Sequence, residues 1–201
     1  MILTRLALSL LFTSLLCTCV RAQKTAVGSA PGLQYHLGYF GNFGYQPGLK
    51  FGAERGFSSR TTERDLRSRR ETVVQTITKT WFWSGDVGFY LDPRNHAAAF
   101  TTWGVTRRRS LNPGGELTWR IAPVGYARTF LTDTYEVTNG TVERVPLAGN
   151  DFYVASFLVG YGRQRPQKRL RAWFLNLNLM LWAPHNTNLL PVLALEYGYR
   201  L

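Results

Sequence analysis

The chain is poor in cysteine and in acidic residues, and beyond its N-terminus it lacks any long apolar run. Its two cysteines, Cys17 and Cys19, both lie near the N-terminus. No later apolar run reaches the roughly 18 residues of a transmembrane helix, so we expect no such helix in the mature chain. The sequence also lacks the short motifs typical of zinc proteases, redox cysteine pairs, serine hydrolases, P-loops and dinucleotide sites.

The N-terminal segment has the features of an export signal. Arg5 supplies a basic start, and residues 6–16 form an apolar stretch. Val20 and Ala22 place compact residues at the two positions that a signal peptidase reads before its cut. This pattern predicts export and cleavage after Ala22.

Cleavage there would define a signal peptide over residues 1–22 and a short leader over residues 23–33. It would also remove both cysteines, so the mature chain could use neither a disulfide nor a thiol nucleophile. A lipoprotein signal is the weaker alternative, because Leu16 and Thr18 precede the cysteines where a small residue is usual.

Basic residues outnumber acidic ones. The chain has 24 lysines and arginines against 12 aspartates and glutamates, which gives a formal net charge of +12. Loss of Arg5 and Arg21 with the signal peptide would leave +10. An exported chain with this excess favours anionic partners such as phospholipid head groups, lipopolysaccharide phosphates or acidic glycans, and we do not expect it to bind nucleic acid.

The segment 169–201 contains two stretches in which apolar and polar residues alternate, separated by a short polar turn. Successive side chains of a strand point to opposite faces, so each stretch predicts a strand with one apolar and one mixed face. A strand that crosses a bilayer in a closed barrel has this pattern. The apolar faces comprise Trp173, Leu175, Leu177, Leu179 and Leu181, and then Leu193, Leu195, Tyr197, Tyr199 and Leu201.

The same alternation recurs along the chain and predicts an all-β protein. Its fold would be an eight-stranded antiparallel up-and-down transmembrane β-barrel over residues 34–201. An even number of strands lets the sheet close with both termini on one side. The predicted strands lie near residues 34–43, 49–57, 71–91, 97–107, 116–131, 151–162, 169–183 and 189–201.

Three segments depart from this regular pattern. Residues 58–70 are polar throughout and are expected to form a loop, whereas the stretch 71–91 exceeds the ~9–11 residues of a membrane-crossing strand and should project past the membrane. The alternation slips near Pro123, which predicts a β-bulge. Asn139-Gly140 predicts a hairpin that extends beyond the barrel.

Clusters of basic residues lie in alternate turns and therefore at one end of the predicted barrel. They form a candidate rim for contact with anions or lipid, facing the periplasm if both termini lie there. Simple anchoring beside the membrane explains the same pattern. The rim comprises Arg60, Arg64, Arg67, Arg69, Arg70, Arg107, Arg108, Arg109, Arg165, Lys168 and Arg169.

The inward parity carries many polar residues, and we expect them to fill a narrow lumen with ion pairs and hydrogen bonds. His36, Ser156 and Glu196 could act as base, nucleophile and orienting group, but residue types alone give no geometry, so no catalytic residue is assigned. The histidines lack metal-ligand spacing, and neither metal nor cofactor is expected. The predicted lumen network comprises His36, Lys50, Glu54, Asp86, Asn176, Asn178, Glu196 and Arg200.

Several stretches carry a resemblance to a known group. GDVGFYLDPRNHAAAFTTWGVTRR, TFLTDTYEVTNGTVERVPLAG and the final LPVLALEYGYRL resemble small outer-membrane β-barrel proteins of Gram-negative bacteria, in particular a poorly characterised group from Bacteroidota. The resemblance implies the fold, an outer-membrane location and insertion by the barrel assembly machinery. The chain departs from such barrels in ending at Leu201 rather than at an aromatic residue.

Three functional hypotheses follow. The first is a non-enzymatic outer-membrane barrel that presents residues 131–150 and 58–70 for adhesion, lipid contact or docking of a still unknown protein partner. The second is a lipid-modifying barrel enzyme similar to a lipid A deacylase. The third is a soluble exported barrel that binds an apolar ligand, which would require the Leu175, Leu177 and Leu179 stripe to face inward.

Overall fold

The structure, a computed structural model, describes most of the chain as β-strands. The described residues are 25–42, 46–67, 72–93, 96–111, 114–131, 134–138, 140–145, 148–163, 172–185 and 188–201, so the expected signal peptide lies outside them. The strands are β1 (Thr25–Gly28), β2 (Leu33–Asn42), β3 (Gln46–Arg67), β4 (Thr72–Asp92), β5 (His96–Leu111), β6 (Gly115–Leu131), β7 (Thr134–Thr138), β8 (Thr141–Val145), β9 (Asp151–Arg163), β10 (Ala172–His185) and β11 (Asn188–Arg200).

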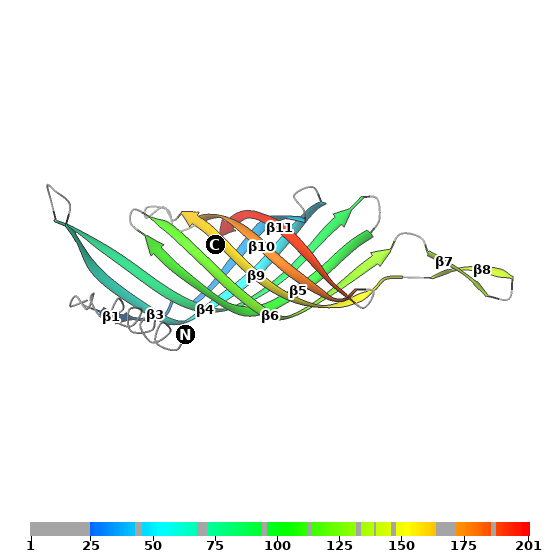
Figure 1. Cartoon of the computed structure of the whole chain (residues 1–201), viewed down its shortest axis with the longest axis horizontal. Coiled ribbons are helices and arrows are strands. Elements are labelled where there is room, and N and C mark those ends of the chain that lie inside the picture. Colours follow the sequence, from blue (N-terminus) through cyan, green and yellow to red (C-terminus); the bar gives the residue numbers. More distant parts are fainter. Residues whose placement is uncertain are drawn as a thin grey trace, which may run out of the picture.

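Eight of these strands form a closed antiparallel barrel, which confirms the predicted fold class (Figure 1). The order around the barrel is β3-β2-β11-β10-β9-β6-β5-β4, and β4 pairs with β3 to close the ring. Each barrel strand pairs with its sequence neighbours in the ring, so the topology is up-and-down. No helix that could span a membrane occurs among the described residues.

Alternation along each strand assigns its side chains to the two sides of the wall. On β10, Leu177 and Leu179 are exposed on the outside, whereas Asn178 and Met180 are buried inside. Because the period of a strand is two, every apolar face in the ring points outward in one consistent register. The predicted faces of the last two strands are confirmed.

The β3–β4 pair continues well past the barrel at one end, here called the ribbon end (Figure 1). β2 pairs with β3 only as far as Arg55, and β5 pairs with β4 only as far as Lys79. Beyond these points the two strands pair with each other, supported by hydroxyl contacts such as Thr61–Thr78 at 3.2 Å. The prediction of a loop over residues 58–70 is therefore wrong as far as Arg67, because the projecting half of β4 needs a backbone partner and β3 supplies it.

The predicted leader over residues 23–33 contains the short strand β1. Residues Thr25–Gly28 pair antiparallel with Ser59–Thr62 of β3, and the Gly56 amide donates to the Pro31 carbonyl at 3.1 Å. The free edge of the ribbon satisfies the backbone groups of this short strand. The projecting ribbon is thus three strands wide where β1 covers it.

At the opposite end β7 and β8 form a separate hairpin that projects beyond the barrel (Figure 1). We call this the hairpin end. Gly140, with φ of 81°, takes the left-handed conformation that the predicted turn requires. The predicted bulge is also confirmed, because the β6–β9 register shifts between Ala122 and Tyr126, around Pro123.

The barrel interior is divided into two layers. Toward the hairpin end, apolar side chains pack against one another, with Phe40 and Phe100 ring centroids 4.8 Å apart and Phe152 and Trp182 centroids 5.3 Å apart. Toward the ribbon end, the buried side chains are mostly polar and charged. The apolar layer fills one half of the lumen, and the polar layer is the part with candidate chemistry.

Candidate functional site

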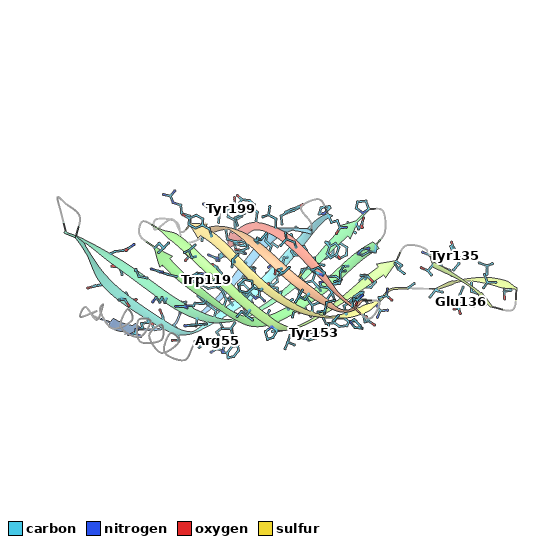
Figure 2. All side chains as sticks on the ribbon, in the orientation of Figure 1. Arg55, Trp119, Tyr135, Glu136, Tyr153 and Tyr199 are labelled. Carbon is cyan, nitrogen blue, oxygen red and sulfur yellow. The ribbon has the colours of Figure 1, made fainter. Side chains whose placement is uncertain are left out.

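The outer wall of the barrel is apolar on every strand. Folded soluble proteins rarely expose contiguous apolar surface on this scale. Figure 2 shows side chains standing out from the wall, with Arg55 and Tyr153 among them. Every barrel strand has exposed hydrophobic side chains on this wall. Examples, one from each strand in chain order, are Leu37, Phe51, Val87, Trp103, Ile121, Phe157, Leu177 and Leu195.

Aromatic residues lie toward both ends of these outward faces. At the ribbon end Trp173 contacts Tyr161 edge to face, with ring centroids 5.9 Å apart, and Tyr199 is its partner in register on β11. At the hairpin end Tyr126 and Tyr153 are partners in register on β6 and β9. Leucines occupy the middle of β10 between these ends, so the wall has an aliphatic centre and aromatic margins.

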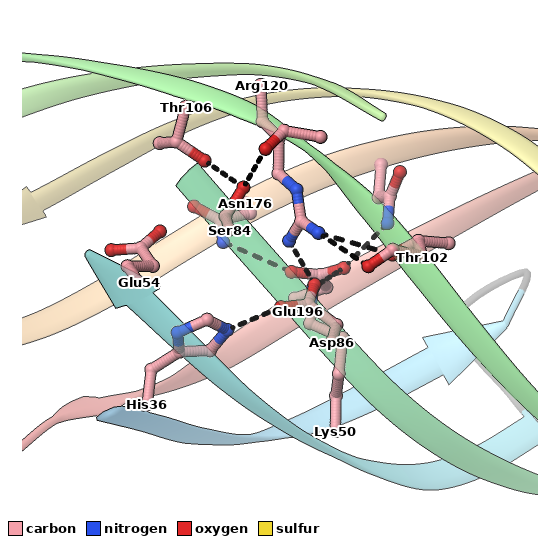
Figure 3. Close-up of polar contacts among 12 residues, drawn as sticks. His36, Lys50, Glu54, Ser84, Asp86, Thr102, Thr106, Arg120, Asn176 and Glu196 are labelled. Atoms are coloured by element: carbon pink, nitrogen blue, oxygen red, sulfur yellow. Dashed lines mark hydrogen bonds and ion pairs between the residues drawn. The ribbon is translucent and has the colours of Figure 1, made fainter. Parts of the chain in front are cut away.

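Asp86 lies at the centre of the polar layer, with 2% of its surface exposed (Figure 3). His36 Nε2 lies 3.1 Å from its Oδ1, and Lys50 Nζ lies 3.1 Å from its Oδ2. The Arg120 guanidinium donates to Asp86 Oδ2 and, at 3.2 Å, to the Thr102 carbonyl. Groups from β2, β3 and β6 thus converge on one carboxylate of β4.

Glu196 of β11 is the second shared carboxylate. Lys50 Nζ lies 2.5 Å from Oε1, so one ammonium joins the Asp86 and Glu196 sites. Asn178 Nδ2 donates to Oε1 at 2.8 Å, and Asn176 Nδ2 donates to Oε2 at 3.1 Å. The two asparagine amides thus supply hydrogen-bond donors to both oxygens of the buried Glu196 carboxylate.

A second ion-pair chain lies closer to the ribbon end. Arg108 donates to Glu54 and to Gln34 Oε1, the latter at 3.1 Å. Its Nε lies 3.8 Å from Glu116 Oε2, and Arg200 donates to the same oxygen. The guanidinium of Arg108 also lies 4.5 Å from the centre of a phenylalanine ring inside the lumen.

Among the described residues, the polar layer contains as many lysine and arginine side chains as acidic ones. Its cations are Lys50, Arg108, Arg120 and Arg200, and its anions are Glu54, Asp86, Glu116 and Glu196. Such pairing offsets the cost of burying the charges, without which they could not stay ionised in the lumen. The network therefore explains why charged residues occur inside a barrel with an apolar exterior.

The side chains leave little space between them. The cavity among His36, Lys50, Glu54 and their neighbours measures about 20 Å³, close to the volume of one water molecule. Gly52 contributes to this close packing, because a Cβ at its position would lie 2.2 Å from Asp86 Oδ1 and 2.3 Å from His36 Cε1. The network fills the lumen in the way expected of a narrow eight-stranded barrel.

The structure places all eight predicted lumen residues inside the barrel and brings them into contact with one another or with further charges. The sequence interpretation missed Glu116 and Arg120, which complete the two ion-pair chains. Their parity could have revealed them, because both alternate with the apolar residues Leu117, Trp119 and Ile121.

The predicted basic rim requires a correction. Arg108 is buried, with 4% of its surface exposed, and belongs to the lumen network rather than to the rim. Arg60 is exposed, and Arg107 and Arg109 lie on the outward parity of β5. Arg64 and Arg67 lie within β3 with undescribed side chains, whereas Arg69, Arg70, Arg165, Lys168 and Arg169 lie outside the described residues.

The possible catalytic trio is not assembled. His36 contacts Asp86, and no hydrogen bond joins any two of His36, Ser156 and Glu196 in the part of the chain that the structure describes. Over that same part, no group of histidine, cysteine and acidic residues could hold a metal ion. The geometry of the lumen therefore supports packing and charge neutralisation.

No family model and no curated protein matches the chain. Among solved structures it is similar to Ail, the attachment invasion locus protein of Yersinia pestis, at 10% sequence identity over 85% of this chain and 99% of that chain, with a TM-score of 0.39. The crystal structure of Ail with the heparin analogue sucrose octasulfate matches at 11% identity over 84% of this chain and 97% of that chain, with a TM-score of 0.34. At these scores the likeness carries no argument about function.

Proposed function

We propose that this chain is a non-enzymatic β-barrel of the bacterial outer membrane whose wall contacts lipid. The observation that carries the proposal is the distribution of polarity, with an apolar outer wall around an interior whose ribbon-end half is charged and hydrogen-bonded. This distribution is the reverse of that in a soluble protein and matches a barrel dissolved in a bilayer.

The soluble alternative is less well supported. It needs the stripe of Leu175, Leu177 and Leu179 inside the barrel as a ligand surface, and these side chains lie outside. The interior instead holds ion pairs around Asp86 and a cavity too small for an apolar ligand. The hypothesis of a lipid-modifying enzyme requires a nucleophile next to a base, and the described residues do not assemble such a pair.

With a filled lumen, the surfaces available for contact with other molecules are the wall and the two projecting ends. The β7–β8 hairpin exposes Tyr135, Val137 and Val142, and Figure 2 shows Tyr135 and Glu136 well away from the barrel. We propose that this hairpin and the β3–β4 ribbon present contact sites for adhesion or for a protein partner. Insertion by the barrel assembly machinery and membership of a Bacteroidota group stay predictions.

Refolding tests the proposal directly. Residues 23–201 are expected to fold when diluted from urea into detergent micelles, because the micelle covers the apolar wall. Diluted into plain buffer, the same chain should aggregate. The measurement is gel mobility of boiled and unboiled samples, in which the folded barrel migrates as a separate band that boiling removes.

A monodisperse, folded product in plain buffer would contradict the proposal, since it would mean that water solvates the outer wall. Far-ultraviolet circular dichroism of both preparations distinguishes a folded soluble product from soluble unfolded chain.

A further inference from the structure

Three basic residues form a patch on the outer wall near the ribbon end. Lys79 of β4 and Arg109 of β5 are partners in register, and Arg107 lies two positions from Arg109 on the same outward face. Thr80 and Arg108, which alternate with them, are buried inside. The patch therefore projects from the barrel where the apolar wall ends.

This patch has no counter-charge within the described chain. Its outward neighbours on β6 are Leu117, opposite Arg109, and Trp119, opposite Arg107. No ion pair joins Lys79, Arg107 or Arg109 to an acidic side chain that the structure describes, and the Nε atoms of both arginines lack a hydrogen-bond partner there. Like charges opposite each other on neighbouring strands repel, so a bound anion would stabilise the arrangement.

Arg107 is held in place by two tryptophans. Its guanidinium carbon lies 5.2 Å from the centre of the Trp81 ring and 5.8 Å from the centre of the Trp119 ring. Contacts of this kind restrict the side chain while leaving its donors available. A cation that is already ordered loses less entropy on binding an anion.

An apolar groove lies next to the patch on the same strands. It measures about 540 Å³, within the range of roughly 300–1,000 Å³ usual for small-ligand sites. Its wall is apolar apart from Arg55 and Ser84, and it includes Leu33, Ala53, Trp83, Trp103, Val105 and Val124. Trp83 and Val105 are the next outward residues after Trp81 and Arg107, so groove and patch are about 7 Å apart along the strands.

We propose that groove and patch together form a binding site for an anionic phospholipid, one whose phosphate charge no head-group cation offsets. The phosphate would lie against Lys79, Arg107 and Arg109, and one acyl chain would lie in the groove beside Trp83 and Trp103. The combination of uncompensated cations and an adjoining apolar channel fits an amphiphilic anion better than a soluble one. The inference rests on the proposed membrane location and adds a specific lipid site to it.

The site can be probed through its own fluorescence. Trp81, Trp83, Trp103 and Trp119 surround it and make up four of the chain's six tryptophans. The barrel is refolded into vesicles that contain brominated phosphatidylglycerol or brominated phosphatidylcholine, and quenching gives the relative binding constant of the two lipids. We expect a preference on the order of 100-fold for the anionic lipid, since each of the three cations near a membrane surface contributes roughly a factor of five.

Arg107→Gln should lower this preference about fivefold, and Lys79→Gln with Arg109→Gln should abolish the remainder. Arg144→Gln on the distant hairpin makes the same charge change and should leave the preference unaltered. Equal binding of the two lipids by the unmodified chain, or an equal loss in the Arg144 variant, would overturn the proposal.

Ala53→Phe tests the groove by filling it. We expect severalfold weaker binding of both brominated lipids with the head-group preference retained, and unchanged binding would overturn the acyl-chain part of the site. Inorganic phosphate at the lipid's concentration should leave the preference unchanged; loss of the preference would mean that the patch binds free phosphate instead.

The boiling-sensitive gel band separates failure of the site from failure of the membrane proposal. A chain that gives this band in vesicles but binds both lipids equally lacks the lipid site alone. If the chain never gives the band in detergent or vesicles, the membrane proposal itself is wrong, whatever quenching of tryptophan fluorescence is measured.

Discussion

Asp86→Asn is expected to lower the free energy of unfolding by about 3–5 kcal/mol, the usual cost of breaking a buried ion pair from one side. Asp86 is in contact with His36, Lys50 and Arg120 inside the lumen. The neutral amide would leave Arg120 without its carboxylate and Lys50 with Glu196 alone. Urea titration of the barrel in lipid vesicles, followed by tryptophan fluorescence, measures the change.

Asp151→Asn is the matched control. Asp151 pairs with Arg128 at 3.6 Å, but the two side chains are 56% and 39% exposed. Water screens such a pair, so its loss should cost less than about 1 kcal/mol. If the two variants lose the same stability, the ion-pair network does not stabilise the barrel in the way described above.

Leu177→Arg is expected to destabilise the barrel by about 2–4 kcal/mol when folding is measured in a bilayer, because the charge would face the hydrocarbon near its midplane. Leu177 lies in the middle of β10, is 45% exposed, and is flanked in register by Val159 and Leu195. The measurement is the same urea titration in vesicles.

The control for this change lies on the hairpin. Val142 is 65% exposed but projects beyond the barrel on β8. Val142→Arg should alter stability by less than about 0.5 kcal/mol, as for ordinary surface changes. Equal effects at the two positions would indicate that both side chains meet the same solvent and would contradict a lipid-facing wall.

Much of the barrel could be predicted because the period-two pattern is local. A strand needs only its own alternating residues to reveal its two faces, which is why the leucine stripe of β10 and the bulge at Pro123 were predicted. The second half of β3 could not be recognised in this way, because residues 58–67 are polar on both faces apart from Leu66. The partner strand β4 indicates it instead, because the backbone groups of the projecting half of β4 must bond to another strand.

The lumen contacts depend on distances that no single strand contains. Parity placed Asp86 and Lys50 inside, but their ion pair needs the β3–β4 register, in which Gly52 is opposite Asp86. The contact of Asp86 with Arg120 joins strands that are not neighbours in the ring. Arg108 was misplaced because three consecutive arginines conceal the alternation that Trp103 and Val105 define.

The apolar groove beside the basic patch could not be predicted from the sequence either. It depends on small residues such as Ala53 and Gly85 meeting at one level on neighbouring strands, where larger outward residues would fill the space. The outward position of Arg107 gains significance only once Trp81 and Trp119 are known to be beside it.

The most direct test of the account is a spin-label scan along β10 in vesicles. Both cysteines precede residue 23, so residues 23–201 offer a cysteine-free background for single-cysteine variants. Labels at Leu175, Leu177 and Leu179 are expected to collide often with oxygen and rarely with a water-soluble nickel complex. Labels at Asn176 and Asn178, inside the filled lumen, should be shielded from both. If nickel reaches the leucine positions as freely as it reaches Val142 on the hairpin, the wall faces water and the membrane account is wrong.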